Sequence, residues 1–232
     1  MNLLKKIIKL FLFSIIGLIL ISFYLIIFHS FREQSNLFEH DSDKDGIVDA
    51  MDWDVDNDGI KNFEDKDADG DGIENLVDIK NNAKDLKGTF YEYLKGKFNN
   101  IGSKLGFLVC YDIPRISYQK AGLSLDLLLR DDYKIHKEFY NAEYGNNLPN
   151  SPFFFRRTRN LYSYCQANNR LILNCRKPKP GDVIFYSRFH IALVIEVHNN
   201  GKYDEIETAP WTIFVVEHKN REWKPKNIGR IL

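Results

Sequence analysis

Cysteine is scarce in this chain of 232 residues, which contains only Cys110, Cys165 and Cys175. An odd number of thiols excludes a fold in which every cysteine is paired within the chain, so at least one thiol stays free. Cys165 and Cys175 lie at the two ends of a short segment and would form a disulfide if their Cα atoms approach to about 4.4 to 6.8 Å. The alternative, two buried reduced thiols, is equally compatible with the sequence.

The chain also lacks a net charge, with 32 basic and 32 acidic side chains. This balance conceals three segments of different charge. Residues 1–38 carry a net charge of +3, residues 39–79 a net charge of −13 and residues 80–232 a net charge of +10. No recognised nucleic-acid reader motif accompanies the basic excess, so we expect no nucleic-acid partner. The length leaves room for one medium-sized domain with accessory segments.

Residues 10–28 contain no charge, no proline and no amide side chain. About 20 apolar residues in a helix span a bilayer core, whereas a cleavable signal peptide usually has an apolar stretch of about 7 to 15 residues and small residues at the cut. No such small-residue site follows here. With Lys5, Lys6 and Lys9 in front, the positive-inside tendency predicts a single-pass signal anchor over residues 1–32 in the cell membrane, with a cytoplasmic N-terminus and an extracytoplasmic C-terminal domain. A long cleaved signal peptide, the alternative, changes the attachment but not the compartment.

The acidic segment, residues 39–79, contains three copies of a thirteen-residue repeat that begin at Asp41, Asp54 and Asp67. In every copy positions one, three, five and twelve are Asp, position six is Gly, position seven is Ile, and position nine is Asp or Asn. Oxygens at positions one, three, five, seven, nine and twelve surround Ca²⁺ in an EF-hand-like loop, where the glycine permits a sharp turn. The predicted ligands, with main-chain carbonyls at the isoleucines, are Asp41, Asp43, Asp45, Ile47, Asp49, Asp52, Asp54, Asp56, Asp58, Ile60, Asn62, Asp65, Asp67, Asp69, Asp71, Ile73, Asn75 and Asp78.

A hard divalent cation makes the convergence of these carboxylates favourable, because they otherwise repel one another. We expect the side chains of Ile47, Ile60 and Ile73 to form a small shared core. The stretch is similar to thrombospondin type 3 repeats and related bacterial calcium repeats. Extracellular calcium modules bind at about 10⁻⁴ to 10⁻³ M, so we expect structural Ca²⁺ in a stiff, permanently loaded spacer. A solvated acidic linker is the alternative.

Residues 88–232 have the pattern of a globular α+β domain. Phe90–Leu94 predict a short amphipathic helix. A second helix ends at Gly122 and begins close to Cys110, because Pro114 is tolerated only in the first turn of a helix. The thiol then lies near the positive end of the helix dipole, which lowers the pKa of a thiol below its free value of about 8.5.

The second half of this domain predicts an antiparallel meander. His190 begins the second strand and is the only histidine in the chain that heads such an apolar run. The expected strands are residues 183–186, 190–197, 204–208 and 214–217.

Several short segments carry a family resemblance. They resemble an uncharacterised bacterial branch of the NlpC-type, papain-like cysteine peptidases. The resemblance implies a helix bearing the nucleophile Cys110, packed on a small antiparallel sheet that bears the base His190. The matching segments are CYDI at 110–113, Tyr118, AGLSL at 121–125, RRTRNL at 156–161, PGDV at 180–183 and HIALV at 190–194.

In the related enzymes a His, Asn or Gln on the strand after the catalytic histidine orients the imidazole. Neither His nor Asn occurs on that strand here, so we assign the role to Glu207, with Thr208 and Glu205 as alternatives. Asp112 corresponds to an acidic residue of the family and either fixes the loop or polarises the site. An imidazole within about 3 Å of the thiol takes its proton and later protonates the leaving amine.

Each of these residues also has a structural interpretation. Cys110 could be an inert buried thiol, and His190 could simply end a strand. Arg156, Arg157 and Arg159 either contact an acidic substrate group or form a solvated face.

The function implied by the resemblance and the compartment is a thiol hydrolase that cleaves an amide bond, in peptidoglycan stem peptides, with peptidoglycan or another envelope polymer as its partner. One alternative is a non-catalytic, calcium-dependent wall-binding or adhesion protein. Another is a thiol acyltransferase or a protein-processing peptidase on the same fold.

Overall fold

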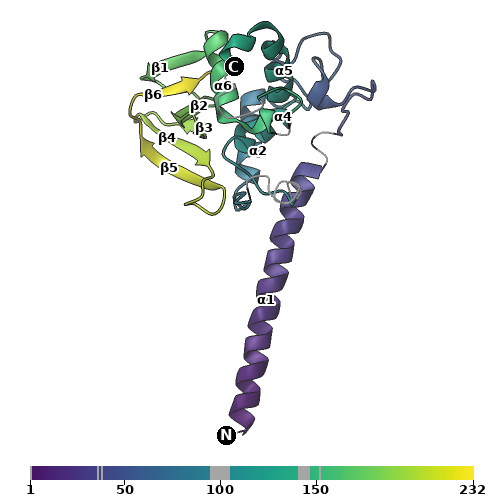
Figure 1. Cartoon of the computed structure of the whole chain (residues 1–232), viewed down its shortest axis with the longest axis vertical. Coiled ribbons are helices and arrows are strands. Elements are labelled where there is room, and N and C mark those ends of the chain that lie inside the picture. The colour runs from purple at the N-terminus through teal and green to yellow at the C-terminus, as the bar shows by residue number, and fades with distance from the viewer. Residues whose placement is uncertain (1, 36, 38, 95–104, 141–146, 152) are drawn as a thin grey trace.

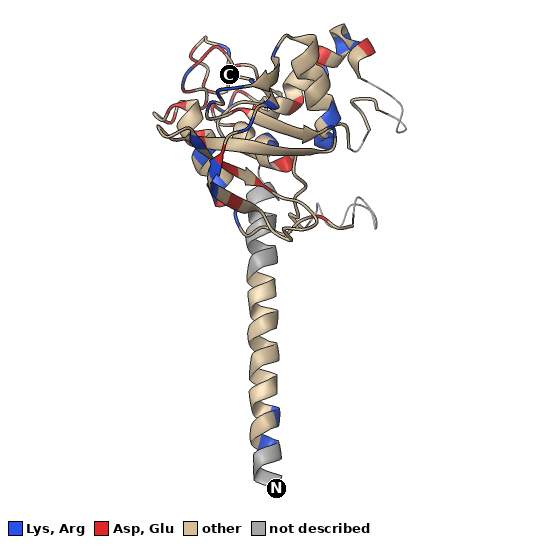
Figure 2. Cartoon of the chain, turned by 90° about the vertical axis from the view of Figure 1, so that its left-hand side faces the viewer, with Lys and Arg blue, Asp and Glu red and all other residues tan. Residues whose placement is uncertain are grey.

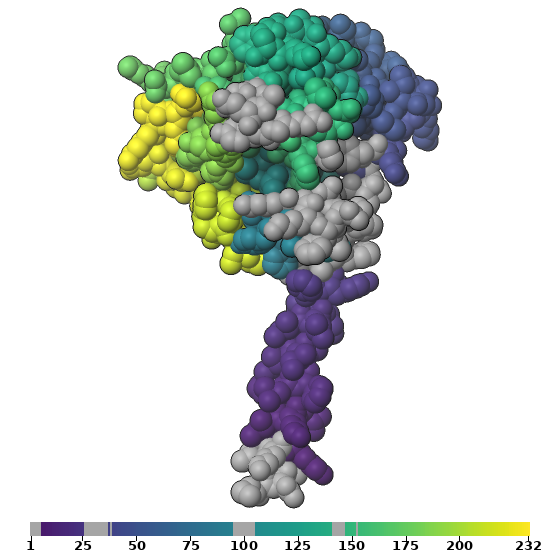
Figure 3. All heavy atoms as spheres, in the orientation of Figure 1, coloured from purple at the N-terminus to yellow at the C-terminus, as the bar shows by residue number. Residues whose placement is uncertain are grey.

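The structure is a computed structural model of the full chain, and it describes all residues except 1, 36, 38, 95–104, 141–146 and 152. Its longest element is helix α1 (Asn2–Ser35), which extends away from the globular part (Figures 1 and 3). The stretch Lys6–Leu25 of α1 is long and apolar enough to cross a bilayer, and none of it is buried in the protein. Its only charges are Lys6 and Lys9 at the N-terminal end (Figure 2). A helix of this kind is a membrane anchor or a signal sequence.

The rest of the described chain has an α+β fold around one six-stranded sheet in which all neighbouring strands are antiparallel. Their order in the sheet is β1-β6-β2-β3-β4-β5, so β3 lies in the interior. This strand is a nearly continuous apolar run because both faces of the sheet are covered. In chain order the strands are β1 (Leu171–Cys175), β2 (Val183–Ser187), β3 (His190–Val197), β4 (Lys202–Glu207), β5 (Val216–Glu222) and β6 (Lys226–Gly229).

Helices pack on one face of the sheet and enclose the main core (Figure 1). A smaller apolar cluster around Tyr203 covers part of the other face. Helix α4 is held between α2 and β3, and its residues Ile113, Ile116 and Tyr118 are buried. The α-helices are α2 (Asn75–Asp85), α4 (Asp112–Gln119), α5 (Leu125–Ile135) and α6 (Thr158–Ala167), and the 3₁₀ turns are η1 (Asp49–Met51), η2 (Lys137–Phe139) and η3 (Phe154–Arg156).

The helix expected at Phe90–Leu94 is wrong. Phe90 forms an antiparallel bridge with Phe214, and Tyr91 forms a parallel bridge with Leu108. The Phe90 and Phe214 rings also pack with their centroids 4.7 Å apart. Aromatic residues favour extended backbone when a partner lies alongside, and here that partner is distant in sequence.

All three cysteines are free and buried. Cys165 belongs to the main core beneath the helices, whereas Cys175 belongs to the cluster on the opposite face of the sheet. This separation explains why the two do not pair. Burial raises the pKa of the Cys165 thiol to about 12, which makes it an inert core side chain.

The acidic repeats pack directly against the globular part (Figure 3). A Cβ atom added at Gly122, just after α4, would lie 2.8 Å from the carbonyl carbon and oxygen of Ala68 in the third repeat. The Ser124 hydroxyl, at the start of α5, donates to the carbonyl of Ala50 in the first repeat at 2.8 Å. The acidic repeats therefore pack on the globular part, whereas we expected a separate spacer at residues 39–79 and a domain at residues 88–232.

The third repeat also supplies the beginning of α2. Its last two predicted ligands, Asn75 and Asp78, both lie in the first turn of that helix. Because α2 packs on both α4 and β3, the globular unit begins inside the third repeat.

Candidate active site and acidic loops

Cys110 lies in the tight turn that starts α4 and is only 8% exposed. The Asp112 backbone N–H donates to the Val109 carbonyl at 2.9 Å, and the Val109 N–H donates to the Asp112 carboxylate at 2.8 Å. The Cys110 thiol donates to the Phe189 carbonyl, with Sγ and oxygen 3.7 Å apart. Phe189 precedes the first residue of β3, so this contact brings that residue close to the thiol.

His190 is that first residue; it bonds to Glu207, and Cys110 lies close enough to raise the pKa of its imidazole. Its Nε2 atom bonds to a Glu207 oxygen, which leaves Nδ1 for the thiol. Burial lowers the pKa of His190, but the bonds to Cys110 and Glu207 raise it more, to about 9 from an ordinary 6.5. The Tyr186 ring stacks on the imidazole with centroids 5.6 Å apart, and the Trp211 ring meets it edge-on at 5.3 Å. The structure thus brings together three residues singled out in the sequence.

The last residue of β4, Glu207, binds two imidazoles. Its second oxygen bonds to Nε2 of His218, on the neighbouring strand β5, at 2.9 Å. Burial raises the pKa of the Glu207 carboxyl, but the bonds to His190 and His218 outweigh burial and hold that pKa below its ordinary value. The sequence did not indicate His218, because the expected fourth strand stopped one residue before it. Extending that strand would have placed His218 beside the strand that bears Glu207.

The alternatives to Glu207 have other surroundings. Glu205 is buried and accepts hydrogen bonds from the hydroxyls of Tyr186 at 2.7 Å and Tyr203 at 3.0 Å, and it pairs with Arg221. Thr208 is fully buried, and its hydroxyl makes no hydrogen bond within the described residues. Glu205 therefore belongs to a separate polar network.

Asp112 and Arg156 form a buried ion pair below the Cys110 turn. The Arg156 Nε atom donates to Asp112 Oδ1 at 2.9 Å, and its Nη1 atom donates to Glu92 at 3.1 Å. Burial lowers the pKa of Arg156, but the two carboxylates raise it above its ordinary value. Asp112 thus fixes the loop, and the interpretation of Arg156 as a substrate contact or solvated residue is wrong. Arg157 donates to Asn147 at 2.6 Å, at the start of α6.

An open depression of about 400 Å³ adjoins His190 and Glu207. His190 and Glu207 line it, whereas the buried Cys110 does not. Trp211 is 70% exposed at its margin, in the loop between β4 and β5. The lining residues are Tyr186, Ser187, His190, Glu207, Trp211 and Arg221.

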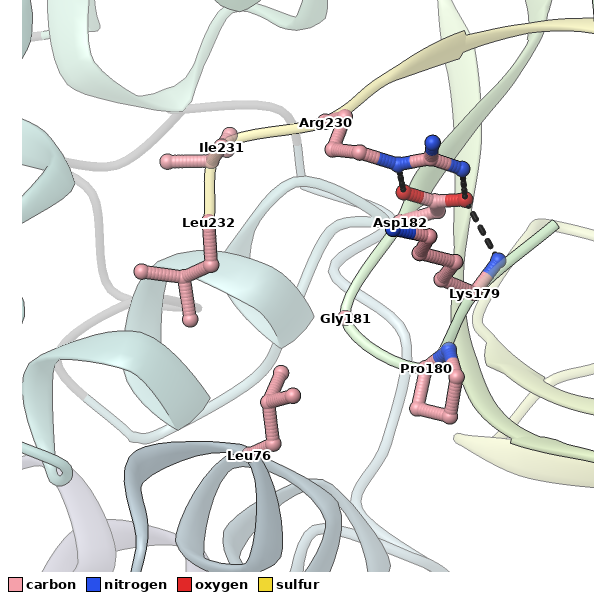
Figure 4. A pocket seen from close by; sticks show the side chains of 8 residues that line it. All are labelled: Leu76, Lys179, Pro180, Gly181, Asp182, Arg230, Ile231 and Leu232. Atoms are coloured by element: carbon pink, nitrogen blue, oxygen red, sulfur yellow. Dashed lines mark hydrogen bonds and ion pairs between the residues drawn. The ribbon is translucent and has the colours of Figure 1, made fainter. Parts of the chain in front are cut away.

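A second pocket, of about 250 Å³, shows what the Pro180-Gly181-Asp182 motif does (Figure 4). The two oxygens of Asp182 each bond to Arg230 at 2.8 Å, and one also accepts from the Lys179 N–H at 2.6 Å. These contacts fix the turn before β2. The motif is structural, and its carboxylate is fully engaged within the protein.

The three acidic loops share one local geometry. The position-six glycines Gly46, Gly59 and Gly72 have φ values of 94°, 90° and 90°, which only glycine adopts readily. Each glycine N–H donates to the position-one carboxylate of its own loop, at 3.0, 3.0 and 2.9 Å. One oxygen from each of positions one, three and five lies within 4.8 Å of the other two. These groups are Asp41, Asp43 and Asp45; Asp54, Asp56 and Asp58; and Asp67, Asp69 and Asp71.

The crowded carboxylates repel one another. Burial and then the charge of Asp71 raise the pKa of Asp69 to about 6. Several buried carboxylate oxygens also make no hydrogen bond within the described residues, which suits a hard cation that takes oxygen ligands. These oxygens are Asp43 Oδ2, Asp54 Oδ1, Asp67 Oδ1 and Asp78 Oδ2.

Two expectations about the loops need correction. The side chains of Ile47, Ile60 and Ile73 are exposed and form no shared core. The buried apolar side chains of the loops are instead Val55 and Ala68, at position two, and Ala50 of the first repeat.

The position-nine side chains bond to the backbone, which differs from their expected role as ligands. Asn62 accepts from the Val55 N–H at 2.8 Å and donates to the Asp52 carbonyl at 3.0 Å. Asn75 makes the equivalent two bonds one repeat later, and Asp49 accepts from the Ser42 N–H at 2.8 Å.

The fold and this site together define an α+β protein in which a thiol, an imidazole and a carboxylate meet at the end of two adjacent strands. Residues 82–208, more than half of the chain, match the family described as "Domain of unknown function (DUF1287)", and the chain belongs to this family. The match includes Cys110, His190 and Glu207 and leaves out the acidic repeats. No curated protein and no solved structure matches the chain.

Proposed function

We propose that the protein is a membrane-anchored extracytoplasmic thiol hydrolase that cleaves an amide bond on a papain-like fold. The observation that carries this proposal is the meeting of Cys110, His190 and Glu207, in which Glu207 bonds to the imidazole and Cys110 lies close enough to raise its pKa. A free thiol is only a few per cent ionised at neutral pH, and a neighbouring imidazole that takes its proton makes it nucleophilic. With a pKa of about 9, the His190 imidazole is protonated at neutral pH.

In the proposed reaction the Cys110 sulfur attacks the amide carbonyl carbon, and backbone N–H groups at the start of α4 stabilise the oxyanion. His190 then gives its proton to the leaving nitrogen as the C–N bond breaks, and an acyl-thioester remains. Water attacks the thioester after giving a proton to His190, and the C–S bond breaks to release a carboxylic acid. Glu207 keeps the imidazole oriented and stabilises its positive charge.

The proposed substrate is a peptidoglycan stem peptide. The similarity to NlpC-type peptidases and the apolar helix α1 support a substrate in the cell envelope. The depression beside His190 is open, which suits a polymer that crosses the surface better than a small enclosed ligand.

We further propose that the acidic loops hold structural Ca²⁺ in the manner of thrombospondin type 3 repeats. The orphaned, buried carboxylate oxygens support this, and each bound ion would neutralise the mutual repulsion of its loop. Carboxylates at positions one, three, five and twelve and the position-seven carbonyl of each repeat would hold the ion. Isothermal titration of the full chain should detect binding at millimolar Ca²⁺, and an absence of binding heat would end this part of the proposal.

Replacing the nucleophile tests the hydrolase. Cys110→Ala should reduce the release of peptide fragments from purified cell-wall material to the background rate, because no other group can form the acyl intermediate. Cys175→Ala is the matched control, since Cys175 lies on the opposite face of the sheet. Undiminished cleavage by a folded Cys110→Ala protein would rule the assignment out.

The low exposure of Cys110 favours a second candidate, a non-catalytic wall-binding module on the same fold. Alkylation separates the two, because an activated Cys110 reacts with iodoacetamide well below pH 8 whereas Cys165 and Cys175 do not. Analysis of the products distinguishes hydrolysis from acyl transfer.

A further inference from the structure

Resting on the function proposed above, we propose that the third acidic loop is a calcium site of the hydrolase domain itself. Ca²⁺ bound there holds helices α2 and α4 in the positions that bring Cys110 and His190 together. The first two loops have no such role.

The ligand that closes the third loop comes from a helix of the domain. Asp78 lies in the first turn of α2, is only 8% exposed, and its Oδ2 makes no hydrogen bond within the described residues. It is close enough to Asp67 and Asp71 for their charges to act on it. The corresponding residues of the other loops, Asp52 and Asp65, each accept a hydrogen bond from the backbone N–H of the next repeat, at 2.9 and 3.1 Å. Only in the third loop would the ion connect the repeat to the packed helix.

Helix α2 in turn contacts both elements of the active site. A Cβ atom added at Gly181 would lie 2.9 Å from the Leu76 side chain, so the first turn of α2 rests on the turn before β2. Further along the helix, Asn82 donates to the Ser117 carbonyl of α4 at 3.3 Å, and Lys80 pairs with Glu196 of β3 at 2.7 Å. Cys110 stands at the start of α4 and His190 at the start of β3.

The third repeat supports the far end of α4 as well. The Ala68 backbone lies against Gly122, and Ala68 is 1% exposed within the main core. Helix α4 is therefore in contact with the repeat at its C-terminal end and with α2 along its side. A shift of the third loop would move both supports.

A bound cation replaces the repulsion between the carboxylates of this region with attraction to the ion. Without it, the loop carboxylates repel Asp78 and so push on the first turn of α2, whereas a divalent ion attracts all of them. A ligand that binds only the folded state at about 100 times its Kd shifts the folding equilibrium about 100-fold. For a chain of this size, that corresponds to a rise in Tm of about 5 to 10 °C.

Two matched variants of the full chain in detergent micelles test the proposal. Asp71→Ala removes the position-five ligand of the third loop, and Asp58→Ala removes its counterpart in the second loop. Both residues are exposed, and each accepts one hydrogen bond from the following isoleucine N–H, at 2.8 and 2.7 Å. The measurements are Ca²⁺ binding by isothermal titration, Tm with Ca²⁺ or with EGTA, and the rate of Cys110 alkylation relative to that of buried Cys165.

We expect Ca²⁺ to raise the Tm of wild type and Asp58→Ala by clearly more than that of Asp71→Ala, in which only the first two loops still bind the ion. We also expect EGTA to lower the ratio of Cys110 to Cys165 alkylation several-fold in the first two proteins, and Asp71→Ala to show the lower ratio without EGTA. Equal behaviour of the two variants would overturn the proposal, and so would a wild-type chain that binds no Ca²⁺. If the calcium-dependent rise in Tm is reduced only in Asp71→Ala while Cys110 is unreactive in every protein, the calcium site stands and the hydrolase fails.

Discussion

The two oxygens of Glu207 bind two different histidines, and Cys110 and Glu207 together raise the pKa of the proposed base. A neutral amide in the same place would orient His190 but would not stabilise its positive charge. The carboxylate does both, which is one cause of the raised pKa of His190. The site is therefore adapted to keep an imidazolium well above neutral pH.

Glu207→Gln should move the alkaline limb of the pH profile to lower pH. His190 must be protonated to donate to the leaving amine, so kcat/KM of the wild type should fall as the pH rises through about 9. Loss of the carboxylate charge lowers the pKa of His190 and shifts that fall toward neutral pH. As a control, the pH profile of Glu222→Gln, at an exposed position of β5, should match that of the wild type. If the alkaline limb of the Glu207→Gln profile is not shifted, the Glu207 carboxylate does not set the pKa of His190.

The same shift has a consequence for stability. Because the folded-state pKa of His190 lies above 6.5, its contribution to stability is complete below about pH 6.5 and is lost as the pH rises through about 9. The wild type should lose more Tm than His190→Gln across this range.

His218 bonds to the second Glu207 oxygen, so under the proposed function it is expected to act as a positioning residue. His218→Asn should lower kcat several-fold with little change in KM, because it loosens the carboxylate without touching substrate. His198, which bonds to Asp204 at 2.8 Å on the same sheet, offers a matched pair. His198→Asn should leave kcat unchanged, and equal effects of the two substitutions would reduce the role of His218 to general sheet stability.

Among the elements, those with strong local signals were predictable and those made by distant partners were not. Strands β2 and β3 are apolar runs, and α4 is bounded by Pro114 and Gly122, so their positions follow from the sequence. Strands β1 and β6 are short, partly exposed and pair with each other across more than fifty residues. Their stability comes from that pairing, which no local pattern reveals.

The same distinction applies to the site. Cys110 and His190 were indicated by their places at the start of a helix and of a strand. The assignment of Glu207 followed from its place on the next strand. The contact of Glu207 with His218 depends on the register between β4 and β5, which the sequence does not define.

Gly122→Ala tests the packing of the third repeat on α4. Both Gly122 and Gly201 have positive φ, 72° and 78°, so alanine at either costs about 1 kcal/mol or slightly more. At Gly122 the new Cβ also meets the Ala68 backbone, whereas at Gly201 it meets nothing within 4 Å. Gly122→Ala should therefore cost about 1 to 3 kcal/mol more than Gly201→Ala in urea unfolding. Equal costs would mean that the repeat moves aside freely.

At the scale of the whole molecule, one apolar helix projects from a body whose acidic loops and helices form a continuous unit (Figures 1 and 3). The apolar helix was predictable because length and composition alone define it. The attachment of the loops was not, because the contact between Ala68 and Gly122 joins segments without any shared sequence signal.

The proposal that α1 is a retained membrane anchor predicts that the mature protein keeps this helix. Intact mass spectrometry of protein purified from membranes should give 27.2 kDa, the mass of all 232 residues, and the protein should stay in the pellet after alkaline carbonate extraction. A mass lower by the first thirty or so residues, with release into the supernatant, would identify a cleaved leader instead.

Helix α2 begins inside the third repeat, so the folded unit starts earlier in the chain than the region that matches the family. A fragment begun at residue 82 would cut α2 in two and discard Ile79 and Ala68, both buried in the main core. It would leave the side of α4 and the turn at Gly181 bare to water. Such a fragment is expected to aggregate, and the smallest autonomous unit has to include the third acidic repeat.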